Sequence, residues 1–136
     1  MYNKILVPMA LDHGISPQTL QIAHTLLGAD GQIIALHVFE VPKGSVSVYI
    51  GEETIERGFA EAFKLLKQKT AGMDGVTPEI TRGQAHHAII DYADEHGFDC
   101  IVVGSHKPDM SDYFIGSTAA RVVRHAPCAV HVHRDS

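Results

Sequence analysis

The sequence predicts an α/β fold in which one five-stranded, doubly wound parallel sheet carries helices on both faces. Continuous apolar runs, typical of strands buried on both sides, recur along the chain. Amphipathic helical patterns separate these runs, and strands that alternate with helices indicate a parallel sheet. The chain has 136 residues, and neither a linker nor a repeat divides it. We therefore expect a single domain over residues 1–136.

The first strand and the first helix are marked by their ends. The apolar run KILVPMA at 4–10 is closed by polar residues. Ser16 then offers an N-cap, and Pro17 suits the first helical position. Apolar residues share one face of the helix that follows, until Gly28 can end it.

Two further strands enclose the second helix. The run QIIALHVFEV at 32–41 predicts one strand, and the weaker run VTPEITR at 76–82 predicts the other. Apolar side chains between them repeat at helical spacing before a stop around Gly72. These side chains are Ile55, Phe59, Phe63 and Leu66.

The last part of the chain repeats the alternation. An apolar stripe over 85–93 predicts a third helix, for which Gly97 is the C-terminal cap. Strands at 101–104 and 128–132 flank a fourth helix, whose end Pro127 marks.

Composition excludes several classes of function. A net charge of −5 argues against the broad basic face that nucleic-acid binding needs, although a local basic patch stays possible. No apolar run approaches the roughly 18 residues of a membrane helix, and the N-terminus lacks a signal-peptide core. We therefore expect a cytoplasmic protein with no nucleic-acid partner and no membrane insertion. Cys100 and Cys128 form no CxxC motif, and we expect both to be buried, reduced thiols.

The segment between Gly104 and Gly116 holds eleven residues, many of them polar, and a helix follows it directly. A helix N-terminus supplies unpaired N–H groups and a partial positive charge, which suit a phosphate. The segment therefore predicts a phosphate site, and a plain surface connection stays open as the alternative. The candidate donors are Gly104, Ser105, His106, Lys107, Gly116, Ser117 and Thr118.

Motifs of other nucleotide and catalytic sites are absent from the sequence. Neither the P-loop pattern GxxxxGK[ST] nor the dinucleotide fingerprint GxGxxG occurs. No GxSxG elbow occurs either, and no base is positioned beside a nucleophile. We therefore predict no catalytic residue, and any hydrolysis should be slow.

Several segments together resemble the universal stress protein family. They are YNKILVPM at the N-terminus, LHV near the end of the second strand, RGQAHHAIIDYA at the third helix and, most specifically, GSTAARVVRHAPCAVHV near the C-terminus. The resemblance covers nearly the whole chain. It implies the strand order 3-2-1-4-5, the Rossmann-like fold of the adenine nucleotide alpha hydrolase-like proteins, and a homodimer formed through the C-terminal strand.

The nucleotide-binding branch of that family carries a motif that resembles G-x-x-G-x9-G-[ST]. Gly104 and the pair Gly116 and Ser117 match it. Lys107 replaces the second glycine, and the spacing that follows is one residue shorter. The similar segment GSHKPDMSDYFIGST resembles a subgroup that is also associated with adenine nucleotides, so the expected ligand is ATP or another adenine nucleotide.

Contacts to the nucleoside are implied at the ends of the first two strands. The family's base contacts are mostly backbone groups, which map to Pro8, Met9 and Val38. The family usually has aspartate directly after the first strand, where this chain has Ala10, and a carboxylate follows at Asp12. The implied nucleotide-binding set is Pro8, Met9, Ala10, Asp12, Val38, Gly104, Ser105, His106, Lys107, Gly116, Ser117 and Thr118.

The resemblance implies a regulatory role in a stress response, with a protein partner that the sequence does not identify. Two alternatives stay open. One is a nucleotide-independent interaction module of the same family, which Lys107 and Ala10 favour. The other is a slow ATP hydrolase.

Other polar residues have two interpretations each. Asp109 and Asp112 could hold Mg²⁺ beside the phosphates, or remain solvated. Side chains of His86 and His87 should point in different directions on a helix, which argues against a shared metal. The resemblance places His125 at a structural position with backbone hydrogen bonds.

Two further pairs of polar residues lie near the C-terminus, one of histidines and one of arginines. His131 and His133 share one face of the last strand and could bind a metal, titrate at a dimer interface or simply be solvated there. Arg121 and Arg124 fall on the polar side of the fourth helix, which we interpret as a solvated face.

Overall fold

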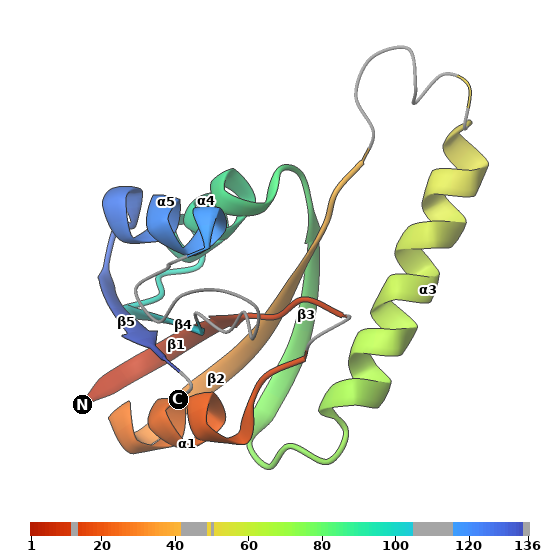
Figure 1. Ribbon diagram of the computed structural model, residues 1–136. Helices are drawn as coiled ribbons and strands as arrows, with labels where there is room; N and C mark the ends of the chain where they lie inside the picture. Colours follow the sequence, from red (N-terminus) through yellow and green to blue (C-terminus); the bar gives the residue numbers. More distant parts are fainter. Residues whose placement is uncertain (12–13, 42–48, 50, 105–115, 135–136) are drawn as a thin grey trace.

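The computed structural model describes residues 1–11, 14–41, 49, 51–104 and 116–134. Strands and helices alternate along the chain (Figure 1). The elements are β1 (Tyr2–Pro8), α1 (Pro17–Leu26), β2 (Leu27–Phe39), α3 (Glu52–Thr70), β3 (Val76–Arg82), α4 (Ala85–Glu95), β4 (Cys100–Gly104), α5 (Ser117–His125) and β5 (Ala129–His133).

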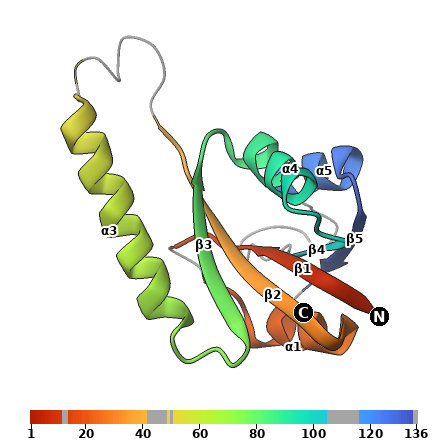
Figure 2. The same cartoon turned by 180° about the vertical axis from the view of Figure 1, so that it is seen from behind.

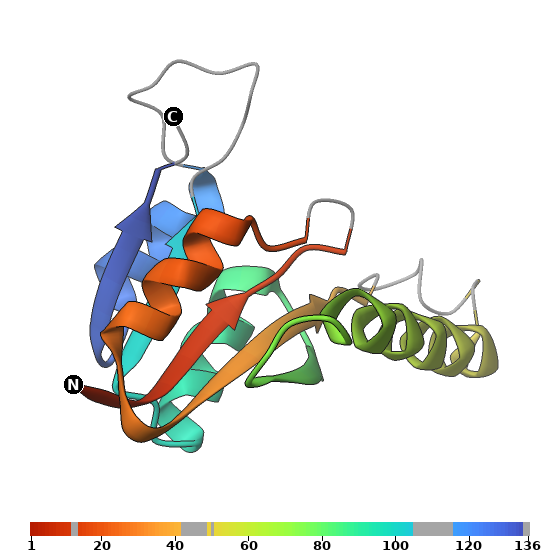
Figure 3. The ribbon, with the colours of Figure 1, turned by 90° about the horizontal axis from the view of Figure 1, so that it is seen from below.

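The sheet has five strands in the order β3-β2-β1-β4-β5, and every neighbouring pair is parallel. The predicted fold class and strand order are confirmed. Figure 3 shows β5 at one edge of the sheet and α3 beyond the opposite edge. The strand order reverses between β1 and β4, which is where ligands bind in open sheets of this kind.

Helices cover both faces of the sheet, α1 and α3 on one and α4 and α5 on the other (Figures 1 and 2). Side chains of β1 alternate between the two layers. Leu6 belongs to the core beneath α4 and α5, whereas Ile5 and Val7 belong to the core beneath α1. All three are almost completely buried, which explains why the strand is continuously apolar.

The ends of α1 show one confirmed prediction and one correction. The Ser16 hydroxyl accepts the Thr19 N–H at 3.1 Å, as expected of an N-cap. The helix, however, ends at Leu26, two residues before Gly28, and Gly28 lies in β2. A Cβ at Gly28 would lie 3.0 Å from the Met1 nitrogen and 3.2 Å from the Tyr2 oxygen. Glycine is needed there for the close approach of β2 to β1.

β2 begins at Leu27, five residues before the predicted start at 32, and the other strand ends differ from the predicted ones by no more than two residues. β1 begins at Tyr2 and ends at Pro8, and β5 covers 129–133. α4 is followed by Gly97 in the left-handed conformation, at φ +68°, as the predicted C-terminal cap requires. α5 ends directly before Ala126 and Pro127, as expected.

β1 and β4 are paired at two positions, in the middle of β1 and at the start of β4. Their register joins Ile5 to Cys100 and Leu6 to Ile101 and goes no further. At this end, the Asp99 carboxylate accepts N–H groups from Asn3 and Lys4, each at 2.9 Å. Burial acts to raise the pKa of Asp99, but the N–H donors outweigh it and hold the pKa below its ordinary value. The two strands are thus fixed at one end and separate at their carboxyl ends.

The two cysteines are both free, and they differ in burial. Cys100 is buried in the core, as predicted, whereas Cys128 is only half-buried, because it precedes the edge strand β5. Among the described residues, no helix combines the length and the apolar character that crossing a bilayer requires.

Candidate functional site

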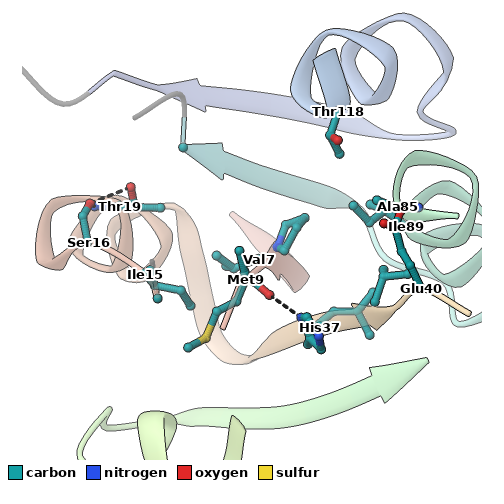
Figure 4. A pocket seen from close by; sticks show the side chains of 16 residues that line it. Val7, Met9, Ile15, Ser16, Thr19, His37, Glu40, Ala85, Ile89 and Thr118 are labelled. Atoms are coloured by element: carbon teal, nitrogen blue, oxygen red, sulfur yellow. Dashed lines mark hydrogen bonds between the residues drawn. The ribbon is translucent and has the colours of Figure 1, made fainter. Parts of the chain in front are cut away.

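A pocket of about 590 Å³ opens at the carboxyl ends of β1, β2 and β4, between the first turns of α1, α4 and α5 (Figure 4). Its size is that of a small-molecule site. The lining is largely apolar, with a few polar groups. It comprises Val7, Pro8, Met9, Ala10, Gly14, Ile15, Ser16, Thr19, Leu36, His37, Val38, Glu40, Ala85, Ile89, Gly104 and Thr118.

The backbone of Met9 is held on both sides by β2. Its N–H donates to the Leu36 carbonyl at 2.8 Å. Its carbonyl lies 3.0 Å from Nδ1 of His37 (Figure 4). Because a carbonyl can only accept, Nδ1 is the donor in this contact. Met9 therefore has no unpaired N–H to offer a ligand.

Val38 presents its backbone polar groups to the pocket. In a parallel sheet, successive residues direct their N–H and C=O groups to opposite sides of the strand. The Leu36 carbonyl faces β1, where it accepts the Met9 N–H. Val38, two residues further along β2, faces the same side, but β1 has already ended at Pro8. Its N–H and C=O thus point to the space that the pocket occupies.

The end of β4 lies against the first turn of α1. Thr19 is buried, and its hydroxyl accepts from the Ser16 hydroxyl at 2.9 Å. A Cβ placed on Gly104 would lie 3.4 Å from the Thr19 Oγ1. Gly104 therefore leaves the space between β4 and α1 free of a side chain.

Glu40 joins β2 to the start of α4. Its Oε1 accepts the Ala85 N–H at 2.9 Å, and the side chain of Gln84 at the N-cap does not cap the helix. A carboxylate at a helix N-terminus is favoured by the helix dipole. One carboxylate is therefore fixed at the rim of the pocket on the β2 side.

The start of α5 closes the remaining side of the pocket. Gly116 is the N-cap residue and provides no side-chain cap for the first N–H groups of the helix. A Cβ at Gly116 would meet no described atom within 4 Å. Thr118 lines the pocket, whereas Ser117 lines a neighbouring groove between α4 and α5.

Part of the predicted nucleotide-binding set comes together in this pocket. Pro8, Met9, Ala10, Val38, Gly104 and Thr118 all line it, although they come from four separate parts of the chain. Gly116 lies at the adjacent helix start, and Ser117 faces the other groove. The residues that lie outside the described part of the chain are Asp12, Ser105, His106, Lys107, Asp109 and Asp112.

Four polar lining residues lie outside the predicted nucleotide-binding set: Ser16, which the sequence marks only as an N-cap, Thr19, His37 and Glu40. Their signal was present in part. His37 and Glu40 lie next to or shortly after Val38, at the carboxyl end of a predicted strand, where ligand contacts concentrate. Thr19 looks in sequence like any polar residue in a first helical turn, and only its burial against Gly104 reveals its place.

The described lining is suited to binding. Glu40 and His37 are the titratable side chains among the described lining residues, and each hydrogen-bonds to backbone. Among the described residues, no three His, Cys, Asp or Glu side chains are grouped to hold a metal. The pocket can enclose a planar ring, form hydrogen bonds to the edge of that ring through backbone groups, and place an anion near the N-terminus of a helix.

Comparisons with known proteins agree with this architecture. The model of the universal stress protein family matches residues 1–134. A universal stress protein of Methanothermobacter thermautotrophicus is 29% identical over 149 residues, covering 98% of this chain and 97% of that protein. The solved structure of universal stress protein UspA from Lactobacillus plantarum is 26% identical, with a TM-score of 0.70 and 98% of each chain covered.

One solved structure adds information about ligands. A universal stress protein family protein from Arabidopsis thaliana, solved with AMP bound, has a TM-score of 0.61. The match covers 98% of this chain and 92% of the Arabidopsis chain. Because the two are only 16% identical, the likeness is one of fold.

Proposed function

The chain belongs to the universal stress protein family, and on that premise we propose that it binds an adenine nucleotide in the pocket at the carboxyl ends of β1, β2 and β4. One observation carries the proposal. β1 and β4 separate after two paired residues, and the space between them is lined by Pro8, Val38, Gly104 and Thr118. The fold neighbour that holds AMP supports the choice of ligand class.

The base would lie against the end of β2. The backbone N–H and C=O of Val38 offer a donor and an acceptor side by side. Adenine carries the complementary pair on its Watson–Crick edge, an N1 acceptor beside an N6 amino donor. The neighbouring lining residues Val7, Met9 and Ile15 provide apolar surface for the ring. Hypoxanthine has an oxygen in place of the amino group and a hydrogen on N1, so in the same position it would leave both backbone groups of Val38 without a partner.

The ribose would meet Glu40. Ala10 cannot accept a hydrogen bond from a hydroxyl group through its side chain, whereas the Glu40 carboxylate has accepting capacity beyond the Ala85 N–H. An acidic residue after the second strand takes a ribose hydroxyl in many dinucleotide-binding folds. Glu40 would thus do for this chain what aspartate after the first strand does elsewhere in the family.

The phosphates would lie at the start of α5. The first N–H groups of that helix have no side-chain cap from Gly116, and the helix dipole favours an anion there. Ser105, His106 and Lys107 would contribute from the segment outside the described residues. Asp109 and Asp112, in the same segment, would be the ligands for Mg²⁺ where a polyphosphate is bound.

Titration calorimetry with AMP, ATP and IMP tests the proposal. We expect AMP and ATP to bind and IMP to bind at least tenfold more weakly, because the two backbone groups of Val38 would stay unpaired. Glu40→Gln should lower the affinity for AMP by about tenfold, since a charge-assisted hydrogen bond becomes a neutral one. Glu61→Gln, which removes the same charge from the exposed face of α3, is the control. Absence of binding by every nucleotide would leave the nucleotide-independent interaction module as the function.

The regulatory form would be a homodimer, with bound nucleotide controlling access of a cytoplasmic protein partner. β5 is the edge strand next to β4, and its residues 130–133 are half-buried. A second copy could extend the sheet along that edge. Sedimentation equilibrium at micromolar concentration should give the mass of a dimer, and a monomer throughout would contradict this part. ATP turnover should be slow, because the described lining holds no nucleophile paired with a base.

A further inference from the structure

A second hollow lies between α4 and α5, on the helical layer that covers one face of the sheet. It is an open groove of about 610 Å³, close in size to the nucleotide pocket. The two hollows adjoin, because Ala85 and Thr118 line the first and their neighbours His86 and Ser117 line the second. The remaining residues of this α4–α5 groove are His87, Ile90, Ala120, Arg121, Arg124 and His125.

Every ionisable side chain in the described lining of the groove is a base. Arg121 and Arg124 carry permanent charges and are exposed on α5. His86, His87 and His125 add three imidazoles, the type of side chain whose charge can change near physiological pH. The chain as a whole has a net charge of −5, so this groove is a basic patch on a protein that is otherwise acidic.

The histidines are arranged differently from the sequence prediction. The rings of His86 and His87 lie 4.1 Å apart, centroid to centroid, and do not point in different directions. His125 is exposed and lines the groove, whereas a structural residue with backbone hydrogen bonds was expected. Among the described residues, these side chains do not form a metal-binding group.

Positive charge already acts on the centre of the groove. The His86 Nδ1 lies 3.5 Å from Nη1 of Arg121. Burial lowers the pKa of His86, and the nearby His87, Arg121 and His125 lower it further, while Glu40 acts in the opposite direction. These groups come from α4, α5 and the end of β2. An anion in the groove would relieve the repulsion and favour the protonated imidazoles.

The shape of the groove fits an extended acidic chain better than a compact phosphate. Phosphate sites gather backbone donors at one point, whereas here the bases are spread along a helix whose backbone is internally bonded. Arg121 and His125 are one turn apart, about 6 Å along the axis. Alternate side chains of an extended peptide lie about 6.6 Å apart on one face. Ile90 and Ala120 offer apolar contact between the charges.

We propose that the α4–α5 groove binds an acidic segment of a partner protein, with carboxylates at alternate positions, and binds it more tightly as the pH falls through the histidine range. Arg121 and Arg124 supply the constant attraction. His86, His87 and His125 supply the pH dependence. This inference does not rest on nucleotide binding, because none of these five side chains belongs to the nucleotide pocket.

Fluorescence anisotropy with a labelled hexapeptide that alternates glutamate and alanine tests the proposal. Measurements at about pH 8 and about pH 6 lie on either side of the ordinary imidazole pKa. At low salt we expect affinity to rise about tenfold between the two, and a glutamine-for-glutamate peptide not to bind. The double variant Arg121→Gln with Arg124→Gln should bind the peptide about tenfold more weakly at both pH values. Lys64→Gln with Lys69→Gln removes equal charge from exposed positions on α3 and should change nothing.

Histidine variants separate the groove from a general effect of acid on net charge. His86→Asn with His125→Asn should flatten the pH dependence, whereas His24→Asn on the opposite face of the sheet should leave it intact. Equal binding at both pH values, or equal binding by the Arg121 and Arg124 double variant and the wild type, would overturn the proposal. So would loss of ATP affinity in that double variant without loss of the peptide, which would assign the groove to the nucleotide's phosphates.

Discussion

Replacing Gly104 with valine tests whether the glycine is required for nucleotide binding or for the stability of the fold. The backbone of Gly104 lies outside the left-handed region, and a Cβ added to it would lie 3.4 Å from the Thr19 Oγ1. Valine favours a strand end by up to about 1 kcal/mol over glycine, and the tight contact with Thr19 costs a similar amount. The free energy of unfolding should therefore change by less than about 1 kcal/mol, and Tm by less than about 5 °C.

Nucleotide binding should respond far more strongly to the same change. At a ligand concentration 100 times the Kd, binding stabilises the wild type by about 2.7 kcal/mol, or roughly 8–13 °C in Tm. The valine methyl groups would occupy the space between β4 and α1 at the edge of the pocket. A tenfold loss of affinity would halve the stabilisation, to about 1.4 kcal/mol, and complete loss would remove it.

Thermal unfolding with and without AMP, supported by titration calorimetry, measures both quantities. Gly72→Val is the matched control, because a Cβ at Gly72 would meet no described atom within 4 Å and the residue precedes the amino-terminal end of β3, whereas the pocket lies at the carboxyl ends of the strands. The control should keep the full AMP-induced shift. A Gly104→Val protein that folds normally and keeps the wild-type shift would show that nucleotide does not pass over the end of β4.

Three further predictions concern stability and reactivity. Leu66→Ala should lower the free energy of unfolding by about 3–5 kcal/mol in urea denaturation, because Leu66 is fully buried where α3 meets Met9 and Ala35; a loss below about 1 kcal/mol would mean that α3 packs differently. Asp99 has a lowered pKa, so it contributes stability above its unfolded pKa of about 4 that is lost as the pH falls below that value. Asp99→Asn should flatten the wild-type loss of stability between about pH 5 and pH 3, and an unchanged slope would contradict the role of its two N–H donors. Burial raises the pKa of the Cys100 thiol to about 11, so iodoacetamide at about pH 8 should alkylate the half-buried Cys128 first; peptide mass spectrometry that finds the reverse order would refute this.

The fold class could be read from the sequence because its signals are local. A strand buried on both faces must be apolar at successive positions, as at Ile5, Leu6 and Val7. Helix starts depend on a few neighbouring groups, as in the cap that Ser16 provides for Thr19. Parallel strands also bring all their carboxyl ends to one edge, so the ends of the first and fourth strands marked the place of the pocket.

Which side chains meet inside that pocket was decided only by the tertiary structure. The Met9 carbonyl meets His37 from 28 positions away, and Glu40 reaches the Ala85 N–H across 45. The base-rich groove likewise depends on α4 lying beside α5, which brings His86 to Arg121. A local pattern encodes burial and period along one element. It does not encode the register between strands or the packing of helices, and these fix which distant groups come within hydrogen-bonding distance.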